Sequence, residues 1–349
     1  MAEFLTAKEL AIKVSICLAT LAVVMALCTL TGKIRPPEGP RNISLEKVFA
    51  GPGQKAGDNI DYEIFIYRLQ RVILAALVGA ALACSGVVLQ AILRNPLADP
   101  YILGISSGAG LGVIIAMLCG ITWRFWAGSP TAVFAFVGAL ITVWLVWWIG
   151  YYAGRSQVTS LLLAGVVVNA FFSAVIMFLT SIAKSEQLRS IVYWLMGNIT
   201  DKDWKVLLAS TVCIIAGIIG LFRICHRLNI LTLGEYEAKG LGVDTAKTRV
   251  IAFAFAAFIT AVAVSLSGLI GFVGLIVPHG VRLVFGPDHR QLLPLSAIIG
   301  SIFLVTADTL ARTVFRQEQL PVGVITAIAG GPFFLILLAR YSRKVSWLK

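Results

Sequence analysis

Residues 72–92 read VILAALVGAALACSGVVLQAI and contain no charged side chain. About twenty apolar residues in succession are enough for an α-helix to cross the hydrocarbon core of a bilayer. Pro96 and Pro100 follow closely and prevent the helix from simply continuing. The stretch belongs to a longer apolar block, 64–92, and predicts one membrane-spanning helix.

The composition of the whole chain predicts many such helices. Of its 349 residues, 58% are hydrophobic and 13% are charged, and the mean hydropathy is +0.90, whereas soluble domains have about 25% charged residues. This excludes a soluble multidomain enzyme and predicts an all-α, polytopic membrane protein forming a single transmembrane domain over 1–349. Counting apolar blocks predicts about ten spans: 11–31, 64–92, 101–120, 131–153, 158–182, 204–224, 248–268, 269–286, 293–312 and 321–340.

Topology follows from the number of spans and from charge. An even number places both termini on one side, and the basic end RYSRKVSWLK predicts that this side is the cytoplasm. The block 11–31 is too long for a signal peptide and is interpreted as the first span. The Pro- and Gly-rich segment of about 32–63 is then a periplasmic loop, with a short helix at SLEKVF. The net charge of +12 suits lipid head groups rather than nucleic acid.

Several kinds of active site are missing from the sequence. There is no G-x-x-x-x-G-K-[ST] motif, and LGISSGAGLG (103–112) lacks the phosphate-binding lysine, so its small residues predict helix packing. The cysteines form no CxxC pair, so neither a metal site nor a disulfide framework is expected. We find no catalytic constellation, which argues against an intramembrane enzyme. The chain also lacks the midplane carboxylates typical of an ion-coupled transporter, because Asp308 lies near a helix end with Arg312 four residues on.

Two polar stretches carry the functional hypotheses. In RNPLADPYILGISSGAG (94–110), Pro96 forces Asn95 out of helical geometry, and this is either a gate or an ordinary turn. The second stretch, 226–249, interrupts the apolar blocks with a short helix whose Leu233, Ala238 and Leu241 are expected on one side. A glycine stop at Gly242 and an Asp244 cap follow. These capped pieces favour a docking platform over a plain solvated loop.

Seven segments, in order, resemble the FecCD permeases, the membrane subunits of type II ABC importers for cobalamin, haem and ferric siderophores. They are GAALACSGVVLQAILRNPLADP, LLLAGVVVNA, YWLMGNIT, LGEYEAKGLGV, GFVGLIVPHGVRL, DHRQLLPLSA and LPVGVITAIAGGPFF. Gln70 departs from the family, which usually has proline there. The resemblance implies the type II permease fold and a homodimer in the inner membrane. It also implies two ATPase subunits that bind ATP and Mg, and a periplasmic or lipoprotein substrate-binding protein. The chain itself would hold no cofactor or metal.

The resemblance also assigns roles to particular residues, with coupling helices expected at about 229–247. Contact with the ATPase is expected at Leu233, Gly234, Glu235, Ala238, Gly240, Leu241, Gly242 and Val243. The cytoplasmic gate is expected at Asn95, Pro96, Leu97, Val158, Thr159 and Ser160. Docking of the binding protein is expected at Arg68, Arg71 and Arg312, where head-group anchoring is the alternative. An autonomous ion-coupled secondary transporter remains the alternative function, and the sequence does not identify the substrate.

Overall fold

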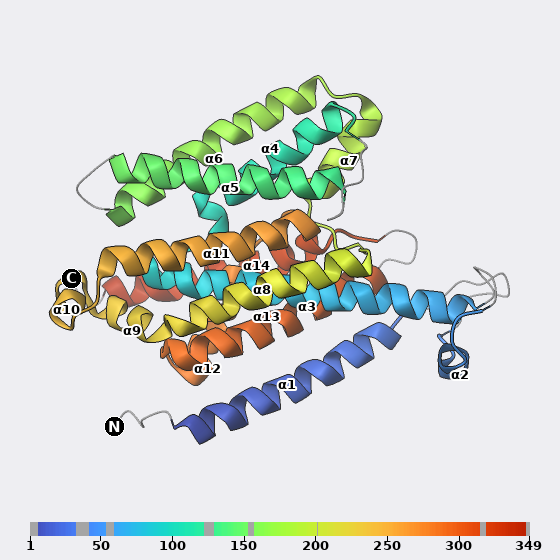
Figure 1. Ribbon diagram of the computed structural model, residues 1–349, viewed down its shortest axis with the longest axis horizontal. Helices are drawn as coiled ribbons and strands as arrows, with labels where there is room; N and C mark the ends of the chain where they lie inside the picture. The colour runs from blue at the N-terminus through green and yellow to red at the C-terminus, as the bar shows by residue number, and fades with distance from the viewer. Residues whose placement is uncertain are drawn as a thin grey trace.

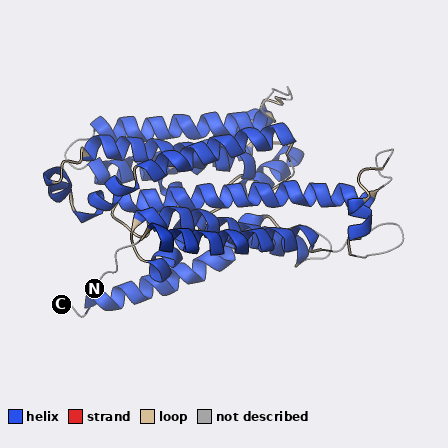
Figure 2. Cartoon of the chain, turned by 60° about the horizontal axis from the view of Figure 1, so that its bottom comes forward, coloured by secondary structure: helices blue, strands red, loops and turns tan. Residues whose placement is uncertain are grey.

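The chain is described by a computed structural model over residues 6–32, 42–53, 59–121, 129–152, 157–200, 202–314 and 319–346. All regular structure in these ranges is helical (Figure 2). The helices are α1 (Ala7–Leu30), α2 (Leu45–Phe49), α3 (Ile60–Ile92), the 3-10 helix η1 (Pro100–Leu103), α4 (Ile105–Leu118), α5 (Pro130–Tyr152), α6 (Gln157–Ser181), α7 (Ser185–Leu195), α8 (Trp204–Arg223), α9 (Cys225–Leu233), α10 (Glu235–Gly240), α11 (Thr245–Ser267), α12 (Val273–Phe285), α13 (His289–Thr313) and α14 (Val322–Ser346).

The predicted fold class is confirmed. Seven helices within the described ranges, α1, α3, α5, α6, α8, α11 and α13, are long and apolar enough to cross a membrane. Three shorter apolar helices, α4, α12 and α14, occupy the remaining predicted spans. The short helix expected at SLEKVF is α2. The chain is therefore a multi-pass membrane protein.

Helix α3 is the centre of the bundle. In its most apolar window 83% of the residues are buried, against none in that of α1. It packs against α8, α11, α12 and α13, and these five helices are called the α3 group (Figure 1). Helices α4 to α7 lie together beside them and are called the α5 group; α5 and α4 contact α11. The core therefore surrounds α3, which carries no charged side chain on any face from residue 72 to residue 92, as expected of a buried span.

Glycines allow the backbones of the α3 group to touch. A Cβ at Gly86 would overlap the carbonyl of Gly274 in α12, and one at Gly79 would overlap the carbonyl of Gly300 in α13. Small residues promote such close helix contacts in membranes, where a hydrophobic driving force between helices is missing. The hydroxyl of Ser301 adds a hydrogen bond to Ala76 O at 2.7 Å. Backbone contact therefore fixes α12 and α13 against α3.

The bundle has two distinct ends, named here the α10 end and the α2 end after the short helices that mark them (Figure 1). Figure 1 marks both ends of the chain on the side of the α10 end, as an even number of spans requires. Helix α7, at the other end, was not predicted. It buries Ile191 and exposes Leu188 and Val192, and at 11 residues it is too short to span a bilayer.

Candidate functional site

The α10 end carries a folded helical segment where the sequence predicted coupling helices. Gly234, with φ of +154°, separates α9 from α10, and Gly242, with φ of +79°, separates α10 from α11. Both angles lie in a region that residues with a Cβ rarely adopt, so glycine permits both turns. Asp244 then caps α11 by accepting a hydrogen bond from Lys247 N at 2.9 Å. The glycine stop and the cap are thus both present.

Two contacts fix α10 to the body of the protein. Ala238 is fully buried, and Glu235 accepts a hydrogen bond from Arg249 of α11 at 3.0 Å. Lys239 forms a second ion pair with Glu235, at 3.2 Å. The hydrogen bond from Arg249, followed by that from Lys239, lowers the pKa of the Glu235 carboxyl. Glu235 therefore stays ionised at neutral pH, and α10 is held as a defined surface feature.

Three large apolar or aromatic side chains of this segment are exposed, beside the exposed Glu237 and Lys239. Leu233, Tyr236 and Leu241 are 65%, 89% and 62% exposed. The expectation that Leu233, Ala238 and Leu241 share one side is wrong, because Ala238 faces inward while both leucines face outward. The break at Gly234 changes the chain direction, so a single helical period does not cover all three residues. The three exposed side chains are named here the α10 surface, and large apolar side chains exposed on one short segment are a feature of interaction sites.

The predicted gate residues lie in two segments at the α10 end (Figure 1). Asn95 is exposed in the turn after α3, and its Oδ1 accepts a hydrogen bond from Leu97 N at 2.9 Å. The turn is sharp because Arg94, one residue earlier, adopts φ of +47°. Thr159 is exposed in the first turn of α6, whereas the side chain of Val158 lies outside the described residues. Pro96, Leu97 and Ser160 are partly exposed. Their role as a gate stays a prediction.

The α2 end contains a buried ion pair that sequence reasoning missed. Arg71 in α3 and Asp308 in α13 are each about 1% exposed and lie 2.8 Å apart. Arg71 also donates to Gln319 Oε1 at 2.7 Å. Arg312 shares the same carboxylate at 3.3 Å, the helical pair that the sequence did predict, and donates to Cys28 O at 3.1 Å. An ionisable residue in each of two spans was the available signal, since such residues usually pair.

All three arginines at which docking is expected are buried. Arg68 and Arg71 are 7% and 1% exposed, and the side chain of Arg312 is 7% exposed. None of the three presents a guanidinium on the surface to an approaching carboxylate. Replacing Arg71 with glutamate would also put two carboxylates together in the interior, so it would test folding rather than docking. The docking of a binding protein itself stays a prediction.

The described residues contain no group of three or more His, Cys, Asp or Glu side chains arranged to hold a metal ion. The α10 end is the other candidate site, because the exposed side chains of the α10 surface lie on a segment that the Glu235–Arg249 hydrogen bond fixes. That arrangement suits contact with another protein.

The family model of the FecCD transport family matches residues 16–340. The chain belongs to this family. A cobalamin import system permease of Halobacterium salinarum is 46% identical over 78% of this chain and 72% of its own length. A hemin transport system permease of Yersinia pestis is 43% identical over 78% of this chain and 82% of its own. FecCD relatives also include permeases named for iron chelatin and for molybdate.

A solved structure agrees with the fold. A metal-chelate type ABC transporter in an inward-facing conformation superposes with a TM-score of 0.80 and 31% identity. The match covers 94% of this chain and 98% of that one. The FecCD chain described here is thus an ABC importer permease, and permeases of such transporters rely on a separate subunit for ATP hydrolysis.

Proposed function

We propose that this chain forms the transmembrane pathway of an ATP-driven importer for an iron–siderophore complex, haem or cobalamin. The α10 surface carries this proposal. Leu233, Tyr236 and Leu241 are exposed on a segment that Ala238 and the Glu235–Arg249 pair hold in place. A partner that moves the permease needs a contact surface that is fixed to the bundle, because a mobile loop would move without moving the helices.

The proposed assembly contains two copies of this chain, two ATPase subunits and a periplasmic or lipoprotein substrate-binding protein. The ATPase subunits would bind ATP and Mg and contact the segment from Leu233 to Val243. In this arrangement the α10 end faces the cytoplasm with both termini, and the α2 end faces outward. The membrane would be the inner, or cytoplasmic, membrane. The lipid-facing helices α1 and α6, with exposed Ile16, Leu163 and Phe171, support multi-pass insertion.

The binding protein would dock on the α2 end. Because Arg68, Arg71 and Arg312 are buried, we assign them a supporting role beneath that surface. Arg71 joins α3 to α13 through Asp308, and Arg312 pairs with the same carboxylate from within α13. Head-group anchoring, the alternative for these arginines, also requires exposed guanidinium groups and is not favoured by their burial.

Transport in proteoliposomes tests the function. The chain would be reconstituted with and without its ATPase, and uptake of cobalamin, haem and a ferric siderophore would be measured with the corresponding binding protein present. We expect uptake of one of these only with the ATPase and ATP. Uptake by the chain alone under a proton or sodium gradient would instead establish the secondary transporter.

Cysteine cross-linking tests the proposed gate. With cysteine at Asn95 or Thr159, both exposed at the α10 end, we expect disulfides between the two copies whose yield depends on the nucleotide bound. Cysteine at Phe49, exposed at the α2 end, is the control and should show no such dependence. Absence of cross-links in every nucleotide state would remove both residues from the gate.

A further inference from the structure

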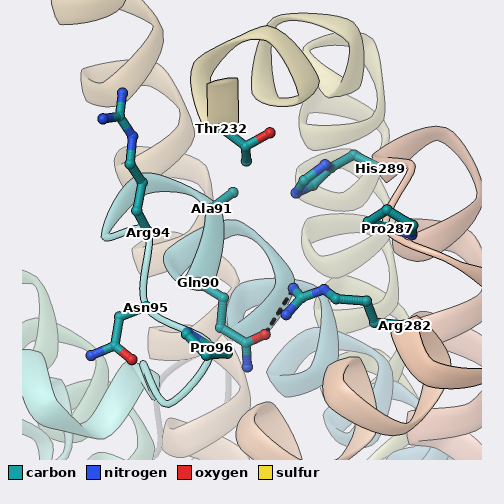
Figure 3. A pocket seen from close by; sticks show the side chains of 9 residues that line it. All are labelled: Gln90, Ala91, Arg94, Asn95, Pro96, Thr232, Arg282, Pro287 and His289. Atoms are coloured by element: carbon teal, nitrogen blue, oxygen red, sulfur yellow. Dashed lines mark hydrogen bonds between the residues drawn. The ribbon is translucent and has the colours of Figure 1, made fainter. Parts of the chain in front are cut away.

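A cavity of about 250 Å³ opens at the α10 end, between the end of α3, α9 and the turn from α12 to α13. Figure 3 shows its lining side chains. They are Gln90, Ala91, Arg94, Asn95, Pro96, Thr232, Arg282, Pro287 and His289. The lining contains two arginines and a histidine but no carboxylate, so the cavity wall formed by the described residues is positively charged.

Asp288, which lies between two lining residues in the sequence, already has hydrogen-bond partners for its charge. Asp288 accepts hydrogen bonds from Arg290 Nη2 at 2.6 Å and from Asn229 Nδ2 at 2.7 Å. Burial would raise the pKa of Asp288, but the hydrogen bonds from Arg290 and Asn229 lower it to about 2. Asp288 is therefore ionised and engaged by groups outside the cavity lining, which leaves it little capacity to balance the cations that face the cavity.

His289 presents an unused polar atom to this cavity. The residue is 4% exposed, and its Nε2 is buried with no hydrogen-bond partner. Asn229 Oδ1 accepts from the backbone N of His289 at 2.8 Å while Asn229 Nδ2 donates to Asp288, so the orientation of this amide is fixed. The ring Nδ1, 2.7 Å from the same Oδ1, is consequently the donor of that pair. In a neutral ring Nε2 then carries a lone pair, and Figure 3 shows the ring directed toward the cavity.

Arg282 supplies the main positive charge. Its Nη2 donates to Gln90 Oε1 at 3.0 Å, and Gln90 is itself held by a hydrogen bond from its Nε2 to Gly274 O at 3.3 Å. This fixes the guanidinium beside the cavity while using only one of its five N–H donors. Arg94 stands at the rim, where its Nε donates to Leu231 O at 3.2 Å. Its guanidinium points away from Arg282 in Figure 3, so we expect Arg94 to contribute less than Arg282 to the positive charge at the cavity.

We propose that this cavity binds a phosphate group that retains one proton, as inorganic hydrogen phosphate or as a phosphomonoester. The N–H donors of arginine match the geometry of phosphate oxygens, and the opposite charges strengthen the hydrogen bonds between them. The lone pair of His289 Nε2 can accept a hydrogen bond from the P–O–H group, which satisfies the buried atom. Sulfate has the same shape but no proton at neutral pH, so it leaves Nε2 unpaired. This chemistry distinguishes the two anions, and the proposal does not depend on the transport function.

Calorimetric titration of the full chain in phosphatidylcholine nanodiscs with inorganic phosphate tests the site. We expect saturable binding of one phosphate per chain. Arg282→Gln should weaken it about tenfold or more, since a charged hydrogen-bond donor is lost. Arg94→Gln, a change at an exposed rim residue that leaves the interior intact, should weaken it by a few fold. Arg227→Gln is the matched control, because this arginine is exposed on α9 and is not part of the cavity lining, and it should bind within about twofold of the unaltered chain.

Two further arms identify the ligand and its source. Sulfate should bind about tenfold more weakly than phosphate. If a lipid phosphomonoester is the ligand, nanodiscs containing phosphatidic acid should abolish phosphate binding by the unaltered chain; if free phosphate is the ligand, they should not. Absence of saturable phosphate binding in phosphatidylcholine nanodiscs, equal affinity for sulfate, or equal losses in the Arg282→Gln and Arg227→Gln variants would each overturn the proposal. The first of these would leave an acidic side chain of a partner protein as the better occupant.

Discussion

Asp308→Ala is expected to lower the free energy of unfolding by about 3–5 kcal/mol, because it leaves a buried charge without its partner. Asp308 is the carboxylate shared by Arg71 at 2.8 Å and Arg312 at 3.3 Å, and all three side chains are at least nine-tenths buried. For a chain of this size the loss corresponds to a fall on the order of 10 °C in the melting temperature. Thermal unfolding of the detergent-solubilised chain would measure it.

A matched control removes a carboxylate from the surface. Glu186 is exposed at the start of α7, so Glu186→Ala should change the free energy of unfolding by less than about 0.5 kcal/mol. The double variant Arg71→Met with Asp308→Leu should recover part of the loss, because an apolar pair can replace a buried ion pair. Recovery would be incomplete, since Arg312 keeps its charge. Equal melting temperatures for Asp308→Ala and Glu186→Ala would show that the ion pair contributes nothing to stability.

The double variant Tyr236→Asp with Leu241→Asp is expected to abolish co-purification of the ATPase. Both side chains are more than half exposed in the free chain, so the change should leave its own melting temperature nearly unaltered. At an interface each new aspartate would lose its hydration. The loss of two central apolar contacts typically weakens binding by about a hundredfold or more. The measurement is the amount of ATPase retained with the affinity-purified chain.

Two variants separate this effect from general damage. Gly240→Leu adds a side chain where the first added carbon meets no atom of this chain within 4 Å, so lost ATPase would report a clash with the partner alone. Gly242 is less informative, because its φ of +79° strains any larger residue. Phe49→Asp changes an 85% exposed aromatic residue at the α2 end and should retain the ATPase. Normal retention in the α10 variants would remove the coupling assignment.

The spans could be predicted from the sequence because each depends on a local property, the length of an uncharged apolar run. Helix α3 matches the predicted block 64–92 closely at its end, since Pro96 follows and Arg94 already leaves the helical region. Gly242 and Asp244 were predictable for the same reason, as stops and caps depend on neighbouring residues. The partners are expected only from the family resemblance, because no local pattern contains them.

Contacts between distant segments could not be predicted in this way. Arg71 and Asp308 are 237 positions apart, and the burial of Arg68, Arg71 and Arg312 depends on neighbours that no local pattern identifies. The cavity is another case, since Gln90, Thr232 and His289 come from three helices. Helix α7 was missed because its apolar residues follow a helical period within a polar background, which a search for continuous apolar runs overlooks.

The glycine contacts of α3 decide where this protein can bend. At Gly86–Gly274 and Gly79–Gly300 one backbone rests directly on another, so no side-chain rotamers are available there to absorb a small displacement. We therefore expect α3, α12 and α13 to move together as one rigid unit. The α5 group meets the α3 group chiefly through α11, where phenylalanine and tryptophan side chains such as Phe253 and Trp147 are in contact and can slide over one another. We therefore expect a relative movement of the two groups to occur along α11, and the Glu235–Arg249 pair connects α10 to the beginning of that helix.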